Sequence, residues 1–256
     1  MIKRELIEKS FDEYVAGYDL TDEQINLKAI HTRMVAKLTD EISESLELSQ
    51  DDRDIMWTIG MLHDIGRFEQ VKRYHTFVDS KSVDHAKFGA DLLFIDGLMD
   101  KFGGDGMQAE ELELIELAIR QHNRYRISDN LSVRKQMLCN IIRDADKLDI
   151  MRVNRQSSVE AVYGVSDAEL KNSLVTDEVM ANFREKRCVP RDIRVTPVDS
   201  LVGHISFAFE LVYAKSREIA LKQGFIFQML DFKSNDAHTR ECFLEMNKIT
   251  HNLIHL

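Results

Sequence analysis

The sequence predicts an all-α protein, and three observations lead to this prediction. Proline occurs twice and glycine 11 times in 256 residues, which is few for a sheet rich in tight turns. Nearly every long segment repeats its apolar residues with the period of a helix. Single His and Asp residues interrupt several of these apolar faces, as they do where a helical bundle holds a metal. We therefore expect a helical bundle with a helical C-terminal extension.

The first helix of interest carries His31, in KAIHTRM. Thr21 and Gln24 stand three residues apart ahead of it, and this capping-box spacing predicts where the helix opens. His31 shares a predicted buried face with the apolar residues that follow it at helical intervals. These residues are Met34, Val35, Leu38 and Ile42.

The next helix is expected over residues 51–64, DDRDIMWTIGMLHD, and places His63 and Asp64 in its last turn. Gly66 follows, and glycine tolerates the left-handed conformation that ends many helices. We therefore expect this helix to end against Gly66. Residues 71–82, VKRYHTFVDSKS, have the composition of a loop.

Three further predicted helices each carry one polar residue on an apolar face, and residues 102–106 (FGGDG) form a turn between two of them. The apolar partners are Phe88, Gly89 and Leu92 for His85, Ile115, Ala118 and Ile119 for His122, and Ile142 and Ala145 for Asp146. An ionisable side chain on such a face is costly to bury unless it is paired or binds a metal. Imidazole and carboxylate together suit borderline transition metals, so a buried metal site explains the pattern.

The C-terminal part stays helical but loses this pattern. We expect a metal-binding core over residues 1–153 and a helical extension over residues 154–256, packed on the core. Residues 186–199 hold both prolines, Pro190 and Pro197, and are predicted to be extended or weakly stranded. Residues 201–214, LVGHISFAFELVYA, are apolar nearly all round and predict a buried helix.

Composition restricts the possible partners. The net charge of −10 disfavours general binding of a nucleic-acid backbone. No segment has the length and apolarity of a membrane span or a signal peptide. The three cysteines are an odd set without paired spacing, which fits a reducing compartment, so we expect a cytoplasmic protein. The oligomeric state is left open.

The order of these residues resembles the HD superfamily of metal-dependent phosphohydrolases, which is named for its H…HD…D ligands. The match falls on His31, His63, Asp64 and Asp146. The additional His85 and His122 resemble the two-metal branch of that superfamily. The phrases DHAKFGADLL, AIRQHNRY and NIIRDADKLDIMR look similar to HD-type diadenosine tetraphosphate hydrolases. HD-GYP phosphodiesterases are a looser match, because they carry Lys where this chain has Arg67 and because the GYP signature is absent.

The resemblance implies an all-α HD-domain bundle with two divalent transition ions, of iron, manganese, cobalt, nickel or zinc. Asp64 would be shared by both ions, and His31, His63 and Asp146 would complete one of the two sites. His85 and His122 would complete the other site.

The implied reaction is hydrolysis of a phosphate ester or anhydride in a small, nucleotide-like substrate. Arg67 or Lys147 would stabilise developing charge, and Arg67 and Arg124 would bind phosphate. Two alternatives stay open. One is a di-iron HD-fold oxygenase, whose ligands are nearly the same, and the other is a non-enzymatic metal-binding or sensor module.

Overall fold

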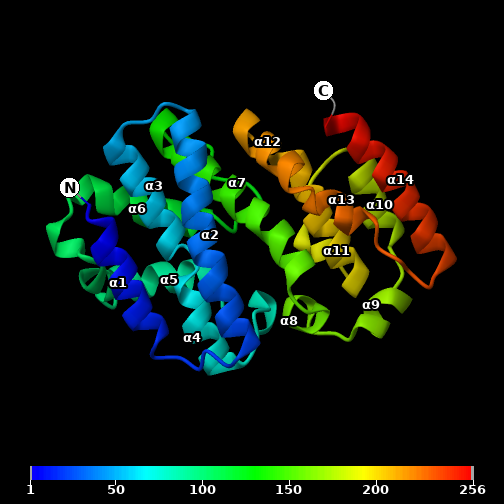
Figure 1. Ribbon diagram of the computed structural model, residues 1–256, viewed down its shortest axis with the longest axis horizontal. Helices are drawn as coiled ribbons and strands as arrows, with labels where there is room; N and C mark the ends of the chain where they lie inside the picture. Colours follow the sequence, from blue (N-terminus) through cyan, green and yellow to red (C-terminus); the bar gives the residue numbers. More distant parts are fainter. Residues whose placement is uncertain (1, 255–256) are drawn as a thin grey trace. The chain divides into compact units, whose positions relative to one another are not determined.

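All regular secondary structure in the described part of the chain is helical. The structure is a computed structural model and describes residues 2–254, with the backbone alone for 252–254. No strand occurs among these residues, so the predicted all-α class is confirmed. The chain forms two compact units, Met1–Asp146 and Lys147–Leu256. Figure 1 shows the helices of each unit. Among the described residues, no helix combines the length and the apolarity needed to cross a membrane.

The first unit is built from six helices of its own and the first part of a seventh. Short 3-10 turns cover Asp79–Lys81, Leu98–Phe102 and Gly104–Gly106, the last two where a turn is expected. The helices are α1 (Arg4–Val15), α2 (Glu23–Ser45), α3 (Gln50–Leu62), α4 (Ile65–Tyr74), α5 (His85–Phe94), α6 (Ala109–Gln121) and α7 (Val133–Gln156). The boundary between the two units lies within α7. The domain boundary that the sequence analysis places after residue 153 stays a prediction.

Helices α2 and α3 pack closely because a glycine lies between them. A Cβ built on Gly60 would lie 2.5 Å from the Cα of Ala36, so no larger residue fits there without moving a backbone. The cap of α2 differs from the expected one, because the carboxylate of Asp22 accepts the hydrogen bond from the backbone N–H of Gln24. Asp22 caps this helix because its carboxylate reaches the exposed N–H groups of the first turn. The expected Thr21–Gln24 capping box is therefore wrong.

Gly66 has a different role from the expected one. Helix α3 ends at Leu62, His63 is its C-cap, and Asp64 precedes the new helix α4. Gly66 lies inside α4, where a Cβ would come within 2.6 Å of the carbonyl oxygen of His85. The glycine therefore permits close packing of α4 on α5 rather than ending α3. Because α4 runs to Tyr74, the loop expected over residues 71–82 begins later.

The second unit is a set of shorter helices around its own apolar core. They are α8 (Val159–Tyr163), α9 (Asp167–Asn172), α10 (Asp177–Arg184), α11 (Pro197–Ile205), α12 (Ala214–Gln223), α13 (Phe225–Leu230) and α14 (Ala237–Ile254). Residues 186–196 form no strand, and Pro197 opens α11, where its missing N–H is harmless. The buried helix expected over residues 201–214 is shorter, because α11 gives way to a 3-10 turn at Ser206–Glu210.

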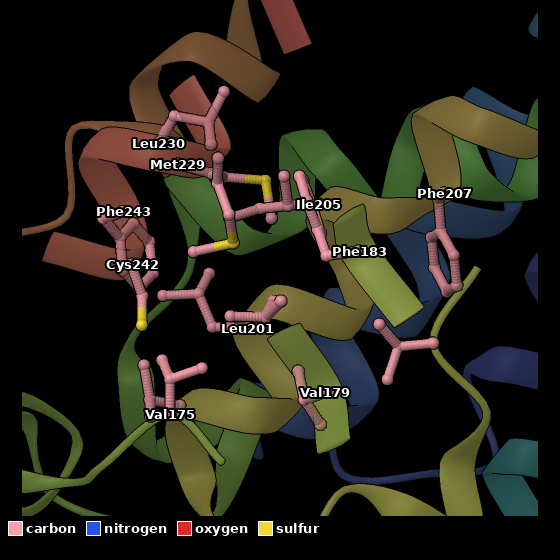
Figure 2. Close-up of a cluster of buried hydrophobic side chains, with 14 of the residues drawn as sticks. Val175, Val179, Phe183, Leu201, Ile205, Phe207, Met229, Leu230, Cys242 and Phe243 are labelled. Carbon is pink, nitrogen blue, oxygen red and sulfur yellow. The ribbon is translucent and has the colours of Figure 1, made fainter. Parts of the chain in front are cut away.

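The core of the second unit gathers side chains from most of these helices. Val179 and Phe183 from α10 face Leu201 and Ile205 from α11, and Met229 of α13 joins them (Figure 2). These side chains are apolar and fully or nearly fully buried, so they stabilise the unit through burial of apolar surface. That this extension packs on the metal-binding core stays a prediction.

The packing at Gly66 gives a testable prediction. Gly66→Ala should lower the free energy of unfolding by about 1–3 kcal/mol, because a methyl group would force α4 and α5 apart. Chemical denaturation of the purified variant measures this change. Gly106→Ala is the matched control, since nothing lies within 4 Å of its built Cβ. Equal stability of the two variants would contradict the tight packing of α4 on α5.

Candidate metal centre

Six candidate ligands meet in the first unit, where five of them surround the sixth, Asp64. The breaks between helices position several of them, since His63 ends α3, Asp64 precedes α4 and His122 is the C-cap of α6. Most of these side chains are at most 4% exposed, and Asp146 on α7 is 17% exposed. The six are His31, His63, Asp64, His85, His122 and Asp146.

One carboxylate oxygen of Asp64, Oδ2, faces the first group of ligands. The Nε2 atoms of His31 and His63 lie 3.5 and 3.6 Å from this oxygen. The same two nitrogens lie 3.1 and 3.8 Å from Oδ1 of Asp146. Ligand atoms about 2.0–2.2 Å from one ion are separated by about 3.0–3.5 Å, so this group has the dimensions of a metal site.

The other oxygen of Asp64, Oδ1, faces the second group. The Nε2 atoms of His85 and His122 lie 3.4 and 3.7 Å from this oxygen. These two nitrogens are 3.1 Å apart. Asp64 therefore turns one oxygen toward each of two histidine pairs, which is the geometry of a carboxylate that can bridge two ions.

In three of the histidine rings, a hydrogen bond from Nδ1 determines that Nε2 is the nitrogen free to bind a metal. Nδ1 of His63 donates to the carbonyl of Gly60 at 2.8 Å, and Nδ1 of His122 donates to the carbonyl of Ile119 at 2.7 Å. Nδ1 of His85 donates to the carboxylate of Asp79 at 2.7 Å. Because a neutral imidazole carries one proton, each Nε2 in these tautomers presents a lone pair to the centre.

Burial keeps two of these rings neutral. It lowers the pKa of His63 to about 4 and that of His85 to about 3, despite the neighbouring carboxylates that oppose the shift. Burial alone would raise the pKa of Asp64, but Lys28 and the surrounding histidines hold it well below its usual range. Neutral imidazoles beside an ionised carboxylate are the protonation states that metal ligands require.

These residues fit a bound metal. Nε2 of His63 is fully buried and makes no hydrogen bond, although a buried polar atom without a partner is rare. The Nε2 atoms of His85 and His122 lie 3.1 Å apart, close enough for both to bind one ion. Each group of three, His31–His63–Asp64 and Asp64–His85–His122, has ligand atoms close enough to hold one ion.

Asp79 supports the second group and was missed by the sequence reasoning. One of its oxygens accepts from His85, and the other accepts from Arg67 at 2.8 Å and from Gln70 at 3.1 Å. Such a carboxylate fixes the ring orientation and raises the basicity of the ligating nitrogen. Asp79 lies in a 3-10 turn, six positions before His85 and outside any helical pattern, so the sequence carried no signal for it.

Lys28 is a second residue that the sequence reasoning missed. Its ammonium group lies 2.6 Å from Oδ2 of Asp64 and 5.5 Å from the centre of the Phe77 ring. Lys28 precedes His31 by three residues in α2 and therefore lies on the same helix face. This three-residue spacing in the sequence would have been enough to identify Lys28 as a cation one helical turn from the ligand His31.

The three basic residues that the sequence analysis selected, Arg67, Arg124 and Lys147, lie in different surroundings. Arg67 is nearly buried, and its Nη1 donates to Gln70, to the carbonyl of Phe77 and to Asp79, while its Nε lies 3.7 Å from Asp64. Arg124 is exposed. Lys147 pairs with Glu210 at 2.8 Å within the second unit. The substrate-binding and catalytic roles of these three residues stay predictions.

The contact between Asp79 and His85 predicts a selective effect on metal binding. Asp79→Asn should weaken metal binding by the group that contains His85 by about 10–100-fold, because it removes the charge that orients His85. Calorimetric titration with Mn²⁺ measures the affinity, and exposed Asp96 supplies the control variant Asp96→Asn. Unchanged affinities in Asp79→Asn would show that Asp79 does not support the site.

Comparison with known proteins agrees with this geometry. Residues 29–151 match the HD domain family, and this range contains all six candidate ligands. Neither the curated proteins nor the solved structures include a significant match to the chain. HD domains generally belong to metal-dependent phosphohydrolases and bind divalent metals. The match therefore supports an HD domain of the metal-dependent hydrolase type in the part of the chain that holds the candidate metal centre.

Proposed function

We propose that this protein is a metal-dependent phosphohydrolase that uses two divalent transition ions. Its substrate is a small phosphate ester or anhydride. The reaction is most similar to that of the two-metal branch of the HD superfamily, which resembles the diadenosine tetraphosphate hydrolases. The observation that carries this proposal is the division of the Asp64 carboxylate between two histidine pairs. A site for one ion would need only one of these groups.

The ligand set suits iron, manganese, cobalt, nickel or zinc better than magnesium, because four imidazoles contribute. Two such ions, when bound, supply Lewis acidity and an activated water to a phosphoryl group. The chain itself contributes the rest of the chemistry. Asp64 fixes both groups of ligands with respect to each other, and the Nδ1 hydrogen bonds hold the rings in the orientation that binding requires.

The positive side chains beside the ligands favour phosphate chemistry over the alternatives. Lys28 and Arg67 both lie within 4 Å of an Asp64 oxygen, although the chain carries a net charge of −10. A di-iron oxygenase acting on a neutral substrate would have little use for such cations. A purely structural metal site would need no open coordination positions and no second ion.

The first prediction of the proposal concerns stoichiometry. Metal-free protein titrated with Mn²⁺ should bind two ions per chain, and His122→Ala should bind about one, because the second group loses a ligand. Elemental analysis after gel filtration measures the ratio. His75→Ala, at an exposed position, serves as the control and should still bind two. Saturation of the wild-type protein at one ion would reject the two-metal assignment.

The second prediction separates hydrolase from oxygenase. Protein loaded with manganese or cobalt should release phosphate from a nucleotide or phosphate ester under strictly anaerobic conditions, because Lewis acidity needs no oxygen. Asp64→Asn should lower this rate by several powers of ten, since both ions lose a shared ligand. Turnover that requires iron and dioxygen would overturn the hydrolase proposal. Absence of turnover under both conditions would favour a sensor or binding module.

A further inference from the structure

We propose that Lys28 is a catalytic residue whose ammonium group binds a phosphoryl oxygen of the substrate beside Asp64. This inference rests on the proposed phosphohydrolase function and identifies the cation that contacts the reacting group. The sequence reasoning assigned that part to Arg67 or Lys147. The contacts of the three side chains favour Lys28.

The position of Lys28 is the first argument. Its Nζ lies 2.6 Å from Oδ2 of Asp64, the oxygen that also faces His31 and His63. The Lys28 side chain is 13% exposed, so it lies at the centre without being completely buried. A substrate phosphoryl group that reaches the ligands of Asp64 would come within reach of this ammonium.

The freedom of Lys28 is the second argument. Asp64 is the only hydrogen-bonding partner of the Lys28 ammonium group among the residues described, and the Phe77 ring lies 5.5 Å away. Arg67, in contrast, is fixed by Gln70, Asp79 and the carbonyl of Phe77. Lysine is also a compact charge on a flexible four-carbon chain. Lys28 can therefore follow a substrate, whereas the anchored Arg67 is suited to positioning Asp79.

The charge balance at Asp64 is the third argument. In the structure, Lys28 neutralises an oxygen that faces two candidate metal ligands. Asp64 would hold a divalent ion through that oxygen, and the positive charge there would repel the Lys28 ammonium and weaken its ion pair with Asp64. Lys28 then needs another anion, and a phosphoryl oxygen supplies one. Without substrate, the same ammonium competes with the metal for Asp64.

The role is electrostatic, and the lysine keeps its proton throughout. In the hydrolysis, the oxygen of water forms a bond to phosphorus, and the bond from phosphorus to the leaving oxygen breaks. One proton of water ends on the leaving group and the other on the released phosphate. Lys28 stabilises the negative charge on the phosphoryl oxygens during this exchange.

The test compares Lys28→Met with Lys28→Arg and with Lys37→Met, an exposed control on the same helix. Calorimetry measures Mn²⁺ binding by metal-free protein and inorganic phosphate binding by manganese-loaded protein. Lys28→Met should bind Mn²⁺ more tightly, by about tenfold, because a competing cation is gone. The same variant should bind phosphate at least about tenfold more weakly. Lys28→Arg should retain most of the phosphate affinity, and Lys37→Met should match the wild type.

Opposite signs in the two titrations distinguish a catalytic cation from a structural one. If Lys28 only stabilised the fold, Lys28→Met would bind Mn²⁺ more weakly and melt at a lower temperature, and that result would overturn the proposal. Unchanged phosphate affinity would overturn it as well.

Phosphate release provides a separate readout. In an active protein, Lys28→Met should lower kcat by about 100-fold or more. If the wild type releases no phosphate from any substrate, the proposed function fails. The two titrations would still decide whether Lys28 binds phosphate beside the metal centre.

Discussion

The candidate metal centre of the first unit is arranged around one carboxylate, that of Asp64, which lies between two pairs of histidines. Burying a carboxylate with four imidazoles is unfavourable unless something replaces the water that they lose. Here the far nitrogens of three rings are satisfied by two backbone carbonyls and by Asp79, while the near nitrogens converge on Asp64. The surrounding residues therefore bind the Nδ1 atoms of these rings, and the Nε2 atoms face the centre, where cations can bind.

The packing of the helices serves this arrangement. Gly60 and Gly66 permit contacts between helix backbones that bring α2 to α3 and α4 to α5. The break between Leu62 and Ile65 places His63 and Asp64 on adjacent helix ends, where His63 belongs to the first group and Asp64 belongs to both. Lys28 and Arg67 then supply positive charge around Asp64 in an otherwise acidic chain. The proposed phosphate substrate rests on this combination of geometry and charge.

Much of this could be predicted from the sequence, because helical periodicity and buried ionisable residues are local signals. The all-α class and the helices that carry His31, His85 and Asp146 follow from them. The role of Gly66 could not be predicted in this way. A close contact between two helices produces no pattern in the sequence of either helix. Asp79 was missed for the same reason, because its partners become neighbours only after folding. The packing of the C-terminal extension on the core stays a prediction.

The most direct test of the central claim is a crystal structure of manganese-loaded protein with data collected at the manganese absorption edge. The account predicts two anomalous peaks about 3.5–4 Å apart, one beside each oxygen of Asp64. His31 and His63 should contact one peak, and His85 and His122 the other. A single peak, or two peaks that do not share Asp64, would contradict the account.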